Sequence, residues 1–278
     1  MAEVLLSQAE KIFIVHGVED NVRIDGRSCL EYRSFEIETG TVSNASGSAR
    51  VRMANTDILV GVKAELGVPA LRKPDEGKLE FFVDCSANAN PKFEGRGGEE
   101  LANDIASMLS QAYGDKNTLD MRKLCIADGQ HCWILYIDVL LLEVGGNLYD
   151  AVSLAVKSAL YDTKIPNLTL TTNEEGQVEI DLSDDPFDYS EIDVENCPIL
   201  VTCCKIGKSH VIDPSVEEEV CSLCRLVVSV TRTGHITSTR KVGAGSLLPE
   251  SIAEMVSTSR EIGISLNEAL LNKLKGRI

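Results

Sequence analysis

The sequence predicts an α+β protein in which two similar lobes each contain several strands followed by a helix. In residues 34–84, short runs of alternating apolar and polar residues are separated by turn residues, a pattern typical of strands. After Pro166 a second set of strands begins, and it ends in a helix predicted over 249–275. Strands that precede helices in this order favour an α+β fold over a doubly wound sheet. We therefore expect an N-terminal lobe over 1–165 and a C-terminal lobe over 166–278.

The first lobe is predicted to open with a helix over residues 1–17, where apolar residues recur at roughly helical spacing. Residues 34–84 then predict an antiparallel meander whose last strand is 79–84. The glycine-rich loop 92–98 leads into a helix over 99–113, whose acidic first turn favours the helix dipole.

The centre of the first lobe is predicted to be a strand, a turn and a helix in direct succession. Residues 131–142 form a nearly unbroken apolar run, typical of a strand that is buried on both faces. Gly145, Gly146 and Asn147 indicate a turn, and residues 148–160 show the apolar spacing of a helix. A strand, a glycine turn and a helix start can hold a phosphate on backbone N–H groups.

The second lobe is predicted to contain short strands over 168–172 and 178–182, followed by a longer strand over 199–206. A short strand over 209–213 and a hairpin made of 226–230 and 235–242 complete its sheet. Acidic residues gather between 174 and 195, and we interpret this segment as a solvated acidic loop.

Composition excludes several classes of protein. The chain has 278 residues, of which 44% are hydrophobic, and it can bury a substantial core. Apolar runs stay below the roughly 20 residues that cross a bilayer, so no membrane partner is expected. A formal charge of −16 argues against a stand-alone nucleic-acid binder. The nine cysteines are an odd number, which favours reduced thiols in a cytosolic or nuclear compartment.

Local motifs leave the chemistry open. Cys221-x-x-Cys224 has the spacing of metal ligands, but Cys203 and Cys204 are neighbours on a predicted strand and so point to opposite faces. Buried thiols are the favoured interpretation, with a zinc-binding protein as an alternative. Fingerprints of serine hydrolases, P-loop enzymes and dinucleotide-binding proteins are absent from the sequence, and we predict no cofactor.

Several motifs, in order along residues 20–270, resemble the ribonuclease PH family. Residues 23–27 (RIDGR) resemble its R-x-D-G-R entry, and residues 47–56 (GSARVRMANT) resemble its G-S-A-x-V and N-T hairpin. Residues 81–86 (FFVDCS) and 212–219 (IDPSVEEE) look like the exosome ring subunits that accompany the catalytic ones. The chain is identified from these motifs as a member of this family.

The resemblance implies a ribonuclease PH-like fold of two β-α-β lobes, also described as ribosomal protein S5 domain 2-like. It also implies assembly with related subunits into a hetero-hexameric ring. RNA-binding cap subunits, associated ribonucleases and RNA are the further partners expected in the assembled complex. The expected locations are the nucleus, the nucleolus and the cytoplasm.

The resemblance further implies that this chain is catalytically inactive. Active members place two carboxylates near the scissile phosphodiester, but Val201 and Gly207 stand at those positions here. They hold phosphate at a G-G-T-R turn, in which Leu148 replaces the arginine. The alternative is an active phosphate-dependent 3′-to-5′ exoribonuclease that uses another carboxylate, such as Asp213. Our candidates for RNA contact are three basic residues: Lys63, Lys92 and Arg96.

Overall fold

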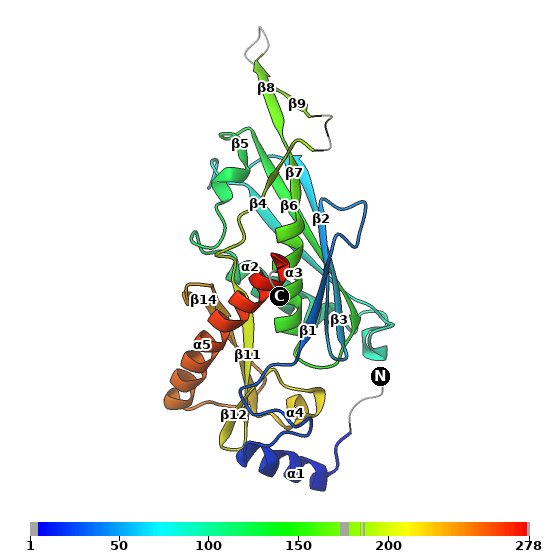
Figure 1. Cartoon of the computed structure of the whole chain (residues 1–278), viewed down its shortest axis with the longest axis vertical. Helices are drawn as coiled ribbons and strands as arrows, with labels where there is room; N and C mark the ends of the chain where they lie inside the picture. Colours follow the sequence, from blue (N-terminus) through cyan, green and yellow to red (C-terminus); the bar gives the residue numbers. More distant parts are fainter. Residues whose placement is uncertain (1–4, 173–177, 184, 186, 277–278) are drawn as a thin grey trace.

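Two β-sheets face each other across one central helix (Figure 1). The computed structural model describes residues 5–172, 178–183, 185 and 187–276. The larger sheet has the strand order β1-β2-β3-β6-β4, with β5 (Cys125–Ala127) also paired to β6. The smaller sheet has the order β12-β11-β13-β14. The central helix, α3 (Leu148–Asp162), packs on β2 and β3 of the larger sheet and on β11 of the smaller one.

The first three strands form the predicted antiparallel meander, but the fourth strand does not continue it. β1 (Phe35–Thr39), β2 (Gly47–Met53) and β3 (Thr56–Gly67) pair in sequence order. β4 (Lys78–Cys85) instead pairs in parallel with β6 (His131–Glu143), which lies between β3 and β4. The meander prediction was therefore wrong for β4.

The physical reason lies in the residues of β6 and in the chain between the two strands. The thirteen residues of β6 are predominantly apolar, which suits a strand with neighbours on both sides. Parallel strands need a long crossover, and helix α2 (Glu99–Ala112) provides it between β4 and β6. The buried residues of α2 are Ile105, Met108, Leu109 and Ala112, four of the apolar positions expected from the sequence.

The leading helix is displaced from its predicted position. α1 spans Gln8–Glu19, and its start is fixed by a capping box in which Ser7 and Glu10 satisfy each other's backbone N–H groups. Residues 1–4 of the predicted helix lie outside the described residues. Ile14 and Val18 are the buried residues of this helix. The rest of α1 remains accessible at one end of the molecule (Figure 1).

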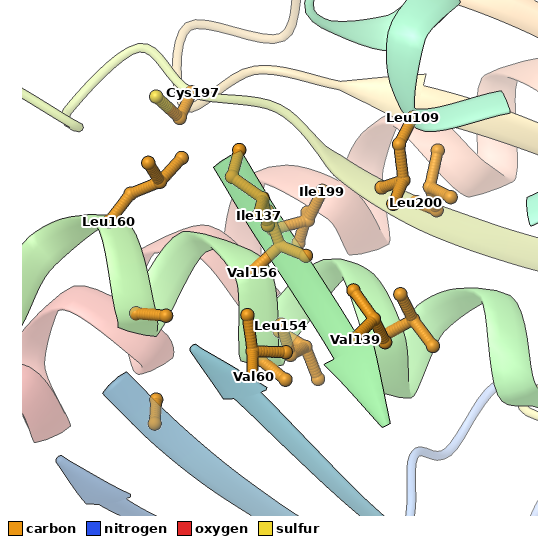
Figure 2. Close-up of a cluster of buried hydrophobic side chains, with 14 of the residues drawn as sticks. Val60, Leu109, Ile137, Val139, Leu154, Val156, Leu160, Cys197, Ile199 and Leu200 are labelled. Carbon is orange, nitrogen blue, oxygen red and sulfur yellow. The ribbon is translucent and has the colours of Figure 1, made fainter. Parts of the chain in front are cut away.

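α3 is buried on all sides, because every residue from Leu148 to Leu160 is buried. Figure 2 shows Val156 of this helix beside Ile137 of β6 and Ile199 of β11 (Ile199–Ile206). The confirmed helix also contains polar residues that the apolar pattern did not explain. Each must find a partner, since a buried polar group without one is destabilising.

Two of these polar side chains bind the second lobe. The Ser153 hydroxyl accepts a hydrogen bond from the Leu200 N–H at 2.9 Å. The Lys157 ammonium donates to the Cys197 carbonyl at 2.6 Å and to the Asn267 Oδ1 at 2.8 Å. Burial lowers the pKa of the Lys157 ammonium to about 8. The central helix is thus fixed to the smaller sheet and to the last helix by polar contacts as well as by packing.

The smaller sheet follows the predicted strands, with one added helix. β12 (Ser209–Ile212), β13 (Cys224–Val230) and β14 (Ile236–Val242) complete it, and α5 (Pro249–Leu274) is the predicted closing helix. The short helix α4 (Val216–Cys221), between β12 and β13, was not predicted. Its capping box of Ser215 and Glu218 is a sequence signal that could have identified it.

The acidic segment of the second lobe is partly ordered into strands, and the predicted strands over 168–172 and 178–182 are confirmed. β7 (Lys164–Pro166) pairs with β10 (Tyr189–Glu191), and β8 (Leu168–Thr172) pairs with β9 (Val178–Leu182). The β8–β9 hairpin projects from one end of the molecule (Figure 1). Residues 173–177, 184 and 186 of the expected acidic loop lie outside the described residues.

Replacing Lys157 with methionine should destabilise the fold by about 1–3 kcal/mol, because the Cys197 carbonyl and the Asn267 side chain would lose a buried donor. Urea denaturation followed by circular dichroism measures this change. Lys208→Met, at an exposed lysine, is the matched control and should change stability by less than about 0.5 kcal/mol. Equal stability of Lys157→Met and the unmodified chain would contradict the role assigned to this contact.

Candidate functional site

The turn before α3 is packed too closely for its glycines to be replaced. A Cβ atom on Gly145 would lie 2.6 Å from the backbone of Asn55, and Gly146 has φ +90° with Pro214 and Val216 backbone atoms 2.8 Å from its Cβ position. The Gly145 N–H donates to the Thr56 hydroxyl, which itself donates to the Gly146 carbonyl at 2.8 Å. The backbone of the turn is therefore packed against, and hydrogen-bonded to, other segments of the same chain.

An internal carboxylate occupies the N-terminus of α3. The Asn147 N–H donates to Glu219 Oε1 at 3.0 Å, and the guanidinium of Arg225 pairs with the same oxygen at 2.9 Å. Glu219 belongs to α4, the helix that follows β12. A helix N-terminus attracts anions through its free N–H groups and its dipole. Here Glu219 is that anion, and Arg225 balances its charge.

Asp213 lies in a buried ion cluster beside this turn. Its carboxylate accepts hydrogen bonds from Arg27 at 2.8 Å, from Arg33 at 2.8 and 2.9 Å, and from the Asn147 amide at 2.7 Å. Burial opposes the charge of Asp213, but the hydrogen bonds and positive charge of Arg33 outweigh it and lower the pKa of Asp213. The Asp213 side chain is fully buried, so these contacts consume its hydrogen-bonding capacity.

A second ion pair fixes the N-terminal segment to α4. The Arg23 guanidinium binds both oxygens of Glu218, at 2.8 and 2.5 Å, and donates to the carbonyls of Ile212 and Asp213. Arg23 is only 3% exposed, so this bidentate pair is nearly free of water. The RIDGR and IDPSVEEE motifs therefore bind each other directly.

Asp150, in the first turn of α3, is the other fully buried carboxylate near the turn. It accepts hydrogen bonds from the Thr202 N–H at 3.0 Å, the Thr202 hydroxyl at 2.6 Å, the Tyr32 hydroxyl and the Asn147 amide. Burial raises the pKa of Asp150 to about 7, because these four donors only partly offset the loss of water. The Asn147 amide thus bridges Asp150 and Asp213.

The three positions that the resemblance assigned to missing catalytic groups have different surroundings. Leu148 is buried in the main core at the start of α3. Val201 points into the core beneath the smaller sheet, next to Met255 and Val228. Gly207, with φ +55°, lies in the β11–β12 turn, where a Cβ atom would meet Glu19 and Val15 of α1.

Two of the three basic residues predicted to contact RNA share the glycine loop, and Lys63 lies apart from them. Lys92 is in the 3-10 helix Pro91–Phe93, and Arg96 follows in the glycine loop, 90% exposed and 3.5 Å from Glu99. Lys63 is on β3 and pairs with Glu65 at 2.5 Å. Through the sheet register Lys63 aligns with Glu80, five positions before the end of β4, which places it about 16 Å from that end along the strand direction.

The cysteines are distributed over separate parts of the core. Cys203 and Cys204 point to opposite faces of β11, as expected, since they belong to different hydrophobic clusters. Cys221 is half-buried at the end of α4, and Cys224 begins β13. Among the described residues, no group of three or more His, Cys, Asp or Glu side chains is arranged to hold a metal ion. In the same part of the chain, no helix is long and apolar enough to cross a membrane.

The sequence indicated the motifs of this site but not its contacts. Local sequence patterns did not predict four residues of this site, because they belong to no catalytic motif. These residues are Arg33, Asn147, Asp150 and Glu219. The sequence did contain a signal for a carboxylate-rich helix at this position. It is the run SVEE at 215–218, typical of a helix N-terminus, followed by Glu219.

Replacing Asp213 with asparagine should destabilise the protein by about 3–5 kcal/mol, because Arg27 and Arg33 would lose their buried counter-charge. Since the pKa of Asp213 is lowered by folding, its contribution is present above about pH 4 and is lost as the pH falls further. Urea denaturation at pH 7 and pH 3 tests both statements. Asp138→Asn, at an exposed carboxylate, is the control. A stability difference that stays constant between the two pH values would contradict this account.

The comparisons with known sequences cover nearly the whole chain. Residues 31–166 match the 3′ exoribonuclease family, domain 1, and residues 196–262 match domain 2 of that family. A protein from Thermococcus kodakarensis named exosome complex component Rrp42 is 36% identical, over 95% of this chain and 94% of that protein. A Dictyostelium discoideum protein, provisionally named exosome complex exonuclease RRP42, is 34% identical, over 97% of this chain and 98% of its own length.

Solved structures agree with the sequence comparison. A chain of the Archaeoglobus fulgidus exosome with RNA bound to the active site has a TM-score of 0.81 and 28% identity, over 93% of this chain and 96% of that one. A chain of an archaeal exosome core has a TM-score of 0.78 and 26% identity, over 94% and 95% of the two chains. They confirm the predicted ribonuclease PH-like fold. The chain belongs to the ribonuclease PH family of 3′ exoribonucleases.

Proposed function

We propose that this chain is a non-catalytic structural subunit of the RNA exosome core ring. It supports 3′-to-5′ RNA processing and degradation by forming part of the ring and of the channel through which RNA passes. Its partners are other ribonuclease PH-like subunits in a hetero-hexameric ring, together with RNA-binding cap subunits and associated ribonucleases. The full-length likeness to relatives named exosome complex component Rrp42 supports this assignment.

One observation carries the non-catalytic part of the proposal, namely the Glu219 carboxylate on the Asn147 N–H at the start of α3. A phosphate that used the same N–H would displace Glu219 or be repelled by its charge. Leu148 occupies the position at which the family resemblance calls for an arginine, and it is buried in the core. The turn keeps the backbone shape of an anion site, but its Asn147 N–H is taken by Glu219 and residue 148 supplies no cation.

Two of the carboxylates near this turn are also unsuited to catalysis. Asp213 is fully buried and neutralised by Arg27 and Arg33, and Asp150 is fully buried among four donors. A group that assists phosphoryl chemistry must reach a metal ion or a proton at the substrate. The name of the Dictyostelium relative includes the word exonuclease, which keeps active phosphorolysis as the alternative function. Under that alternative Asp213 would have to leave its ion cluster.

The proposal also includes the residues that contact RNA and the cellular location of the chain. Arg96 and Lys92 on the glycine loop are the basic residues proposed to approach RNA in the assembled ring, with Lys63 as a separate candidate on β3. We place the chain in the nucleus, the nucleolus and the cytoplasm. The nine free cysteines support reducing compartments of this kind.

Co-expression of this chain with the other ribonuclease PH-like subunits of its organism should yield one particle that contains all of them. Apolar side chains exposed on the isolated chain, such as Phe13 and Phe82, would be covered in such a particle. Native mass spectrometry with identified subunits measures the composition. The chain alone should self-associate or precipitate more readily than the particle. A stable monomer that ignores these partners would contradict the proposal.

The purified chain should release no nucleoside diphosphate from radiolabelled RNA in the presence of Mg²⁺ and inorganic phosphate. The physical reason is the closed turn at the start of α3, where Glu219 holds the N–H that phosphate would need. A catalytic member of the family, assayed in parallel, shows that the conditions permit phosphorolysis. Diphosphate release by the purified chain itself would establish the alternative instead.

A further inference from the structure

The outer edge of β4 has no neighbouring strand. β4 is the last strand of the larger sheet, and its eight residues pair with β6 in a continuous parallel register without a bulge. Within the described part of the chain, the backbone groups of residues 79–84 make no hydrogen bond beyond the pairing to β6. This edge therefore presents a row of unpaired N–H and C=O groups.

Other sheet edges of the molecule are protected in ways that β4 is not. The Lys273 ammonium donates to the Phe35 carbonyl on β1 at 2.6 Å, and the Cys29 carbonyl accepts the Ile212 N–H on β12 at 2.9 Å. β14 carries a mostly polar run, residues 237–241 (TSTRK), with two cations that discourage strand pairing. β4 instead carries the run LEFFV at 79–83 and has no proline or central lysine.

The side chains along this edge are apolar at the centre. Phe82 is 52% exposed on the open face of the sheet, and its ring lies 6.2 Å from that of Tyr136 on β6. Leu79 and Val83, which alternate with Phe82 along the strand, are only half-buried against the core. A strand added beside β4 would remove these side chains from water as well as satisfy the backbone.

The charges nearest Phe82 are negative, and Lys78 at the start of β4 is the cation of this strand. Glu80 and Asp84 flank Phe82 on β4, and Asp138 is its partner in the register on β6. Glu99 and Glu100 open α2, which packs against β4. Carboxylates beside exposed aromatic rings favour lysine or arginine side chains and repel nucleic-acid phosphates. The occupant that fits is therefore a protein segment with basic residues.

We propose that the edge of β4 is a docking site for an extended, basic segment of a neighbouring ring subunit, which adds to the larger sheet as a further strand. The inference rests on the proposed function, because the ring supplies the partner. The Phe82–Tyr136 pair receives an arginine or lysine side chain of that segment, and Glu80, Asp84 and Asp138 balance its charge. The apolar edge of this chain is then covered in the ring.

Hydrogen–deuterium exchange by mass spectrometry tests the backbone contact. Peptides that cover residues 78–85 should exchange at least about tenfold more slowly in the co-expressed ring than in the isolated chain at dilute concentration. Peptides that cover β14 serve as the internal reference. If residues 78–85 exchange equally fast in both states, the proposed site is wrong even though the ring has formed. Protection of the isolated chain by single-stranded polyuridine RNA would also overturn it.

Substitutions test the side-chain contact independently. Phe82→Arg should weaken assembly with the ring partners at least about tenfold, whereas Phe82→Leu should retain it. Leu71→Arg, at a fully exposed leucine in the loop before β4, makes the same change off the edge and should leave assembly unchanged. Circular dichroism checks that each variant folds. Assembly of Phe82→Arg at the affinity of the unmodified chain refutes the docking site alone, while failure of the unmodified chain to assemble refutes the proposed function as well.

Discussion

The complete burial of α3 is the constraint on which the rest of the structure depends. A helix that is buried from Leu148 to Leu160 can be flanked by two sheets, but only if its polar side chains are satisfied on both sides. Ser153 and Lys157 meet this requirement through β11 and α5, and Asp150 meets it through Thr202 and Tyr32. The hydrogen bonds that satisfy the polar residues of α3 thus hold the two lobes in one relative position.

The same helix explains why charge collects at one end of it. The N–H of Asn147, which has no partner within the helix, points toward α4 and donates a hydrogen bond to Glu219. Arg225, Arg33 and Arg27 then balance the carboxylates that crowd the turn. Carboxylates that are paired with arginines in this way stabilise the structure and are not available to a substrate, which agrees with a scaffold role. It also shows how a site can retain its backbone geometry while a side chain of the same protein occupies its Asn147 N–H donor.

Much of the fold could be predicted from the sequence because it depends on local periodicity. Residues close together in the sequence are enough to predict the strand 131–142, the turn at Gly145 and the helix that follows. The parallel pairing of β4 was not predictable in this way, because it depends on which distant strand takes the central place. The same applies to the burial of Arg23, because the RIDGR motif itself contains no sign of it. Its burial follows only from Glu218, which lies 195 residues away.

The pairing of Arg23 with Glu218 also has a consequence for how the chain is made. Residues 35–162 contain every strand of the larger sheet together with α2 and α3, so this sheet is synthesised before its partners in the second lobe. Arg23 has to wait, since its partner emerges from the ribosome 195 residues later. Until then the N-terminal segment remains undocked, and its arginines stay in water. The N-terminal segment is therefore made first but can dock only after residue 218 has been synthesised.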